Sequence, residues 1–273
     1  MMKTFVIGDV HGRRAQLELL LELLPRDEST DMLILLGDYV DRGEDIPGTV
    51  AAVVNLCQEN PERVLCLRGN HEQMLLDFAD SGATVWLHAA VGSQPTIEQY
   101  TRRPLRVRNE QDLYELRQSF IEAVPPEHFE FFRRLPLYHE DDYAIYVHAG
   151  LAEGKHPRDT DPRHLIWSRD MDFFRHYTGK PCVFGHTPTP LLPLLGRLGR
   201  HGLYISHSAI GIDTGYARAS PLSCLQLPDC MLYQAFADGH TATYHLTSFM
   251  PESLRAMQKK CAPLQQSQAQ AEI

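Results

Sequence analysis

The sequence predicts an α/β (α+β) fold in which two β-sheets pack together and helices cover their outer faces. Residues 4–67 alternate short apolar runs, typical of buried strands, with longer runs typical of helices, in the order β-α-β-α-β. Residues 203–246 contain only short strand-like runs separated by turn residues. A parallel half followed by an antiparallel half favours two packed sheets.

The first half of the chain is expected to form three parallel strands, over residues 4–7, 31–36 and 62–67. Pro25 stops a helix predicted over residues 13–24, and Pro47 lies in the first turn of a helix predicted over 46–58. Right-handed crossovers then place the three strands in one sheet. A further helix is expected from His71 onward.

The middle of the chain, about residues 80–134, is expected to be a helical insertion within a single domain that spans residues 1–250. It has several helix-like runs and little strand signal. Its basic stretch, Arg102 to Arg108, is either a solvated surface or a patch that attracts an anionic substrate. Strand signals resume at residues 135–139, 143–148 and 181–184. Residues 254–273 end in a polar segment of low complexity and are expected to be disordered.

Composition narrows the class of protein. The chain has 273 residues, of which 43% are hydrophobic, and this suits one large globular domain. A formal net charge of -9 argues against a protein that coats nucleic acid. The first apolar run is too short for the core of a signal peptide, and no stretch is long enough to span a membrane. We therefore expect a cytoplasmic protein with no membrane partner.

Polar side chains follow the first three predicted strands at the points where these strands end. The turns are Gly8-Asp9-Val10-His11-Gly12, Gly37-Asp38-Tyr39-Val40-Asp41-Arg42-Gly43 and Arg68-Gly69-Asn70-His71-Glu72. Residues two apart in extended backbone, such as Asp9 and His11, project to the same side. Open α/β sheets bind ligands at the carboxyl ends of their strands. Because the same kind of turn recurs, we expect these side chains to share one site.

The candidate metal ligands are oxygen and nitrogen donors that follow predicted strands: Asp9, His11, Asp38, Asn70, His148 and His186. A set without sulfur favours Mn, Fe or Zn over an ion that prefers thiolates. Six ligands exceed what one open catalytic site needs and suit two divalent ions that share a carboxylate. Two such ions lower the pKa of a shared water and neutralise phosphate oxygens, which predicts a phosphoester substrate.

Other residues near these turns suit the remaining needs of phosphate chemistry. The guanidinium groups of Arg42 and Arg68 match phosphate oxygens two at a time, and Arg169 either joins them or serves no such role. His71 is the candidate general acid, and Asp41 is expected to orient it and keep it protonated. Trp86 is expected to be a packing residue.

Five blocks of the sequence occur in an order that resembles a known family. They are Gly8 to Gly12, Gly37 to Gly43, Arg68 to Glu72, His148-Ala149-Gly150 and Gly185-His186. Together they resemble the phosphoprotein phosphatase branch of the calcineurin-like metallophosphoesterases. Later blocks, including Ile166 to Arg169 and Ile212-Asp213-Thr214-Gly215, resemble its short bacterial and phage members. Ala90-Val91-Gly92 departs from the family pattern, and we expect this to alter the packing of the insertion and not the chemistry.

The resemblance implies a four-layer αββα sandwich with a binuclear metal centre. It implies that Asp9, His11 and Asp38 hold one ion, and that the other is held by Asp38, Asn70, His148 and His186. Mn is the expected metal, with Fe or Zn as alternatives. The Asp41–His71 pair and the arginines take the roles argued above.

The expected function is that of a phosphomonoesterase resembling bacterial serine/threonine protein phosphatases. It acts on a phosphorylated protein or a small phosphoester, including aryl phosphates, by direct attack of a metal-bridging hydroxide. The first alternative is a symmetrical bis(5'-nucleosyl)-tetraphosphate hydrolase. Relatives of that kind often have a small residue where Asp41 stands, so Asp41-Arg42 favours the phosphatase. The second alternative is an inert regulator that binds phosphate.

Overall fold

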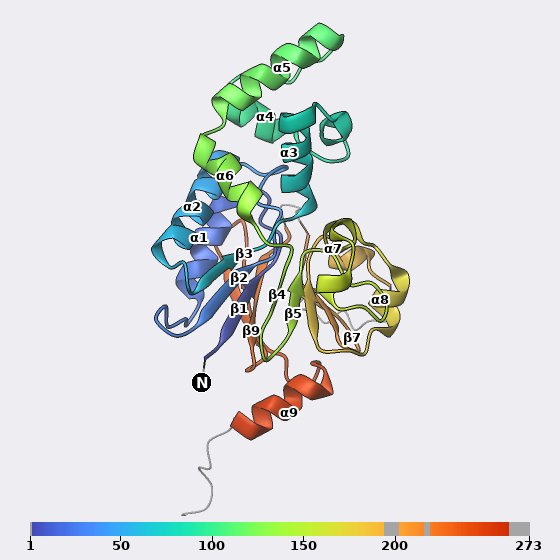
Figure 1. Ribbon diagram of the computed structural model, residues 1–273. Coiled ribbons are helices and arrows are strands. Elements are labelled where there is room, and N and C mark those ends of the chain that lie inside the picture. Colours follow the sequence, from blue (N-terminus) through green and yellow to red (C-terminus); the bar gives the residue numbers. More distant parts are fainter. Residues whose placement is uncertain (1, 194–201, 216–218, 262–273) are drawn as a thin grey trace, which may run out of the picture.

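Two β-sheets form the centre of the molecule (Figure 1). The computed structural model describes residues 2–193, 202–215 and 219–261. The first sheet has the order β11-β10-β9-β1-β2-β3, in which β1, β2 and β3 are parallel and β9, β10 and β11 extend the sheet in antiparallel fashion beside β1. Its strands are β1 (Thr4–Ile7), β2 (Met32–Leu35), β3 (Val64–Cys66), β9 (Leu222–Leu227), β10 (Met231–Ala235) and β11 (Thr241–His245).

The second sheet has the order β4-β5-β6-β8-β7. Strands β5, β6 and β8 are parallel, and the edge strands β4 and β7 are antiparallel to their neighbours. The strands are β4 (Tyr138–Glu140), β5 (Ile145–Val147), β6 (Cys182–Phe184), β7 (Tyr204–Ser206) and β8 (Ala209–Gly211). They lie where the sequence predicts strands, and most of them are shorter than expected.

Alternation along each strand explains the layers. Phe5 and Ile7 pack on one side of β1 in the core shared with the first helices, whereas Val6 packs into the core between the sheets. On the second sheet, Tyr146 packs into the core between the sheets and Ile145 packs into a third core on the opposite side. Three cores between four layers confirm the predicted αββα arrangement.

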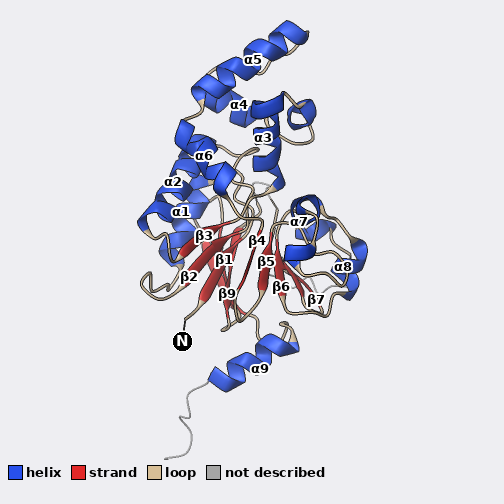
Figure 2. Cartoon of the chain, in the orientation of Figure 1, coloured by secondary structure: helices blue, strands red, loops and turns tan. Residues whose placement is uncertain are grey.

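Helices cover both outer faces of the paired sheets (Figure 2). Helices α1 (Arg14–Leu23) and α2 (Ile46–Glu59) cover the first sheet, and α7 (Pro162–Trp167) and α8 (Met171–His176) cover the second. Pro47 lies in the first turn of α2, as predicted, and Asp45 caps the helix by accepting the backbone N–H of Gly48 at 3.0 Å. The sequence did not predict α8.

The segment between β3 and β4 is helical, as expected. It contains α3 (Asn70–Ser81), η1 (Thr84–Leu87), α4 (Gln94–Thr101), α5 (Glu110–Ala123) and α6 (Pro126–Arg134). In Figure 1, α3, α4 and α5 extend beyond the ends of the strands. The arginines between Arg102 and Arg108 are exposed on the connection from α4 to α5. Two short 3-10 helices, η2 (Pro157–Asp159) and η3 (Thr189–Leu191), lie in later loops.

The predicted disorder from residue 254 is wrong for residues 254–261, because α9 (Glu252–Cys261) lies there. Leu254 is fully buried in the core between the sheets, and Met257 packs against the same core. These two residues are three positions apart and therefore form an apolar stripe on one face of α9. The stripe was not recognised in the sequence because most residues of the chain end are polar. Residues 262–273 lie outside the described part. Within that part, no helix combines the length and apolar character needed to cross a bilayer.

Glu72, in the first turn of α3, joins the turn after β2 to the turn after β3. Its Oε1 accepts the backbone N–H of Tyr39 at 2.7 Å. Its Oε2 accepts the backbone N–H groups of Asp38 at 2.9 Å and Gly69 at 3.0 Å. The side chain is fully buried, so these backbone donors depend on the carboxylate and not on bulk water.

Replacing Glu72 with glutamine should therefore destabilise the fold. The glutamine amide keeps the size of the side chain but turns an NH2 group toward backbone N–H donors. An unsatisfied buried donor costs about 1–3 kcal/mol, and we expect a decrease of this size in the free energy of unfolding. Urea unfolding measures it, with Glu115→Gln on the exposed surface of α5 as the matched control. Equal stability of Glu72→Gln and the unaltered protein would contradict this account.

Candidate metal centre and active site

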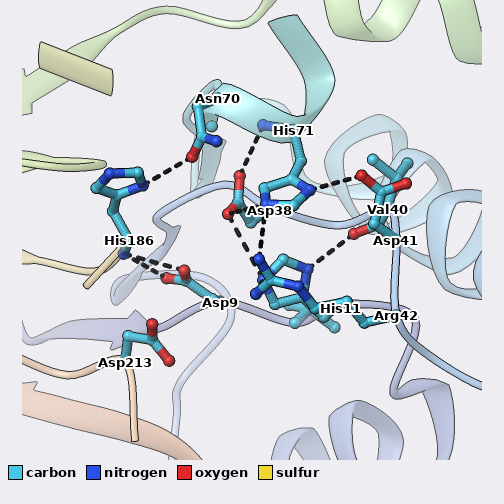
Figure 3. Close-up of polar contacts among 12 residues, drawn as sticks. Asp9, His11, Asp38, Val40, Asp41, Arg42, Asn70, His71, His186 and Asp213 are labelled. Atoms are coloured by element: carbon cyan, nitrogen blue, oxygen red, sulfur yellow. Dashed lines mark hydrogen bonds and ion pairs between the residues drawn. The ribbon is translucent and has the colours of Figure 1, made fainter. Parts of the chain in front are cut away.

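The turns after strands of both sheets meet at one place (Figure 3). Asp9 and His11 follow β1, Asp38 follows β2 and Asn70 begins α3 after β3. From the second sheet, His148 follows β5 and His186 follows β6. All six predicted ligands are buried, and contacts among them, set out below, join them in one cluster.

Glycines in these turns leave the space that the carboxylates occupy. A Cβ atom on Gly69 would lie 2.0 Å from Oδ1 of Asp38, and one on Gly185 would lie 2.0 Å from Oδ1 of Asp9. No real side chain tolerates that distance. The glycines recognised in the sequence are thus explained by close approach of backbone to carboxylate.

Backbone strain is concentrated in the same turns. His11, Asp38, Asp41, Arg42 and His186 have φ between +47° and +70°, in the left-handed region that favours glycine. Such conformations cost on the order of 1–3 kcal/mol each and persist only where the surrounding structure determines them. Strain of this kind is typical of functional sites.

Hydrogen bonds to backbone carbonyls orient two of the histidines. Nδ1 of His11 donates to the carbonyl oxygen of Val40 at 2.8 Å, and Nδ1 of His148 donates to that of Leu36 at 2.9 Å. Because a carbonyl only accepts, each neutral ring keeps a lone pair on Nε2. Burial lowers the pKa of both histidines. Both are therefore held neutral with an unprotonated Nε2, the state in which a histidine binds a metal ion.

Asp38 lies between two groups of possible ligands. One group is His11, Asp38 and His71, and the other is Asp38, His148 and His186; within each, the ligand atoms lie within 4.8 Å of one another. Oδ2 of Asp38 is 3.6 Å from Nε2 of His11, and Oδ1 is 3.3 Å from Nε2 of His148. Burial opposes ionisation, but His148, His71 and His11 lower the pKa of Asp38. A shared carboxylate is what two neighbouring cations need.

Asp9 and Asn70 complete the cluster. Oδ1 of Asn70 is 2.8 Å from Nδ1 of His186 and 2.9 Å from Nε2 of His148. Asp9 accepts the backbone N–H of His186 at 3.0 Å. Burial and the neighbouring carboxylates of Asp213 and Asp38 raise the pKa of Asp9 well above its usual range. This excess of buried negative charge, with nitrogen donors around it, fits divalent cations.

His71 and Asp41 form a tight pair beside this cluster. Nδ1 of His71 is 2.5 Å from Oδ2 of Asp41, and its Nε2 is 3.7 Å from Oδ2 of Asp38. Burial lowers the pKa of His71, but Asp38 and the hydrogen bond with Asp41 outweigh burial and raise it. The ring is therefore anchored at Nδ1, with Nε2 near the shared carboxylate.

The three predicted arginines differ in position. Nη1 of Arg42 is 2.8 Å from Nε2 of His11, and Nε of the exposed Arg169 is 3.4 Å from Nε2 of His186. Arg68 instead donates to Oε1 of Gln73 at 3.0 Å and to the carbonyl oxygen of Arg133 at 2.6 Å. Among the described residues, no hydrogen bond joins the Arg68 side chain to the six ligands.

The segment that departs from the family pattern contacts Arg42 directly. The backbone N–H of Arg42 donates to the carbonyl oxygen of Gly92 at 3.0 Å, and its Nε donates to that of Val91 at 3.3 Å. A Cβ atom on Gly92 would lie 2.8 Å from Cγ of Arg42. The segment thus supports a site arginine in addition to packing within the insertion.

Sequence reasoning missed two charged residues at the site, one buried and the other half-buried. Asp213 follows β8 and is 4% exposed, and burial raises its pKa. Arg13 donates from Nη2 to the carbonyl oxygen of Asp9 at 2.6 Å and from Nη1 to that of Gly215 at 3.0 Å. Asp213 follows an apolar strand and precedes a glycine, so the pattern that identified Asp9 and Asp38 was present. Arg13 carried no comparable signal.

Comparisons with known proteins agree with this geometry. A relative named serine/threonine-protein phosphatase 1, from Salmonella typhimurium, is 40% identical over 84 residues, which are 30% of this chain and 36% of the relative. The chain thus spans about a third of that protein. A relative named asymmetrical bis(5'-nucleosyl)-tetraphosphatase PrpE, from Oceanobacillus iheyensis, is 27% identical over 255 residues, which are 84% of this chain and 90% of the relative.

Solved structures show the same fold. One described as a putative diadenosine tetraphosphatase aligns with a TM-score of 0.57 at 20% identity, covering 89% of this chain and 92% of that chain. The model of the calcineurin-like phosphoesterase family matches residues 2–203. With the fold and the cluster of Asp, Asn and His described above, the chain therefore belongs to the calcineurin-like phosphoesterase family.

Proposed function

We propose that this protein is a two-metal phosphomonoesterase that hydrolyses phosphoserine- and phosphothreonine-type phosphates and aryl phosphates. The observation that carries the proposal is the position of Asp38 between two ligand groups, with the Asp41–His71 pair beside it. The Salmonella relative, named as a serine/threonine-protein phosphatase, supports it.

The ligand sets are those that the family resemblance implies, and the cluster brings their members together. Asp9, His11 and Asp38 would hold one ion, and Asp38 would share the second with Asn70, His148 and His186. The donor set favours Mn, with Fe and Zn as alternatives. Divalent ions in such a site supply ionisation of water near neutral pH and neutralise phosphate oxygens.

The chain's own residues bind the phosphate and move the proton. Arg42, beside His11, and Arg169, beside His186, bind phosphate oxygens from two sides, and we assign the same role to Arg68. Water is the nucleophile, and the bond from phosphorus to the leaving oxygen breaks without a phosphoenzyme. His71 gives the proton on Nε2 to that oxygen, and Asp41 holds the Nδ1–H.

The second candidate is hydrolysis of a bis(5'-nucleosyl) tetraphosphate, in the symmetrical mode that the sequence suggested. It is favoured by the match to PrpE along most of both chains, although that relative is named asymmetrical. A cavity of about 530 Å³ also opens beside His11 and Arg42, with Leu19 and Phe236 in its lining. A volume of that size is typical of pockets for small organic ligands and suits a nucleoside.

Substrate profiling should separate these candidates. The Mn-loaded protein should turn over a phosphoserine peptide with a higher kcat/KM than diadenosine tetraphosphate. Chromatography identifies nucleotide products, because symmetrical cleavage yields only ADP and asymmetrical cleavage yields ATP and AMP. A preference for the dinucleotide that Phe236→Ala abolishes would favour the second candidate. Binding of phosphate without turnover of any substrate would favour a regulator.

Metal content should depend on Asn70. The chelated protein should lose activity toward nitrophenyl phosphate, and Mn should restore it. Asn70→Ala should bind about one ion where the unaltered protein binds about two, because it deletes a ligand of one ion only. Elemental analysis measures this, and Asn55→Ala on the exposed surface of α2 is the matched control. Full activity of the verified metal-free protein would refute the proposal.

His71→Asn should keep both ions and slow the reaction in a way that depends on the leaving group. A serine alkoxide needs a proton, whereas nitrophenolate leaves without one. General acid catalysis typically contributes about 10²–10⁴ in rate, so kcat on a phosphoserine peptide should fall by that order and kcat on nitrophenyl phosphate much less. His88→Asn, at an exposed position, should leave both unchanged. Equal losses on both substrates would mean that His71 binds phosphate and is not the acid.

A further inference from the structure

Asp41 is held by more than His71. Nε1 of Trp86 donates to its Oδ2 at 3.0 Å, and Oγ1 of Thr96 donates to its Oδ1 at 2.5 Å. The backbone N–H of Asp41 in turn donates to Oγ1 of Thr96 at 2.9 Å. Both oxygens of the carboxylate therefore accept hydrogen bonds from the helical segment, in addition to the bond with His71.

These two donors are themselves fixed. Trp86, in η1, is fully buried, and its ring packs against Phe78 and Phe120 with centroid separations of 5.4 and 5.1 Å. Thr96, in α4, is also fully buried. Neither donor has access to bulk water as an alternative partner. Asp41 has φ of +70°, a conformation that needs outside support.

We propose that Trp86 and Thr96 are positioning residues that act on His71 through Asp41. With one oxygen bound to Thr96 and the other shared by Trp86 and His71, the carboxylate cannot rotate about its Cβ–Cγ bond. Nδ1 of His71 is then held in one direction, and Nε2 stays 3.1 Å from Nη2 of Arg42, where the phosphate is expected. The inference rests on the proposed role of His71 as general acid.

The inference gives η1 and α4 a part in catalysis, although neither contains a candidate ligand or the proposed acid. The competing explanation is that Trp86 and Thr96 only satisfy a buried carboxylate and so stabilise the fold. A role in stability would not distinguish leaving groups. A role in aiming the proton donor would, and it would depend on the presence of His71.

The test uses isosteric variants of the full, Mn-loaded chain. Trp86→Phe keeps an aromatic ring in the cluster and removes the N–H donor. Thr96→Val keeps the shape and removes the hydroxyl, while Thr96→Ser retains it. Phe120→Leu perturbs the same aromatic cluster without a hydrogen bond to Asp41 and serves as the matched control. The measurements are kcat and KM on a phosphoserine peptide and on nitrophenyl phosphate.

We expect Trp86→Phe and Thr96→Val each to lower kcat on the peptide by about 10- to 100-fold, the range found when a hydrogen bond that orients a metal ligand is removed. The loss on nitrophenyl phosphate should be small, KM should change little and Thr96→Ser should retain activity. Added to His71→Asn, either change should cause no further loss, because both act through the same group. Phe120→Leu should leave the ratio of the two kcat values unaltered.

Two results would overturn the inference, and they differ from each other. If His71→Asn discriminates between the substrates but Trp86→Phe and Thr96→Val do not, the two residues are structural only. If His71→Asn lowers kcat equally on both substrates, His71 is not the general acid, and the positioning role of Trp86 and Thr96 is then refuted as well. Should Trp86→Phe fail to fold, Thr96→Val against Thr96→Ser decides the question alone.

Discussion

The burial of the Asp38 carboxylate is the constraint on which the rest of this structure depends. A buried charge must be compensated, and Asp38 is 1% exposed. The backbone N–H of His71 donates to Oδ1 at 3.1 Å, and Nε2 of the neutral His11 and His148 rings lies near its two oxygens, where a bound cation would complete the compensation. Glycine at position 69 leaves it room, and Glu72 holds the N–H of Asp38 itself. The turns after β2 and β3 are thus arranged around this one group.

The residues around Asp38 are themselves held by further hydrogen bonds. The histidines that face Asp38 are fixed by backbone carbonyls at Val40 and Leu36. The strained turn after β2 is fixed by Glu72 on one side and by Thr96 on the other. These contacts form a buried network of polar groups. Such a network defines a single geometry only when all of its members have hydrogen-bond partners. The helical segment supplies several of those members.

Most candidate residues of this site could be predicted from the sequence, because each lies in a short strand-and-turn pattern that neighbouring residues define. A strand followed by a glycine turn indicates the candidate ligands up to Asn70, and histidines after later strands indicate His148 and His186 as further candidates. The contact of Trp86 with Asp41 joins residues 45 positions apart, and no local pattern reports it. The helix α9 was missed because only Leu254 and Met257 carry its apolar stripe in a polar stretch. The direction of the Arg68 side chain depends on Gln73 and Arg133, and motif spacing does not encode it.

The two sheets contribute to the ligand cluster from opposite sides. Asp9, His11, Asp38 and Asn70 come from the first sheet, whereas His148 and His186 come from the second, and the bond from the N–H of His186 to Asp9 already crosses between them. Cations bound by residues of both sheets would thus link the two sheets across the core between them. Because a ligand that binds only the folded state stabilises it, metal occupancy and cohesion of the two halves are thermodynamically linked. In this architecture a metal cofactor bound at the cluster would also stabilise the packing of the two sheets against each other.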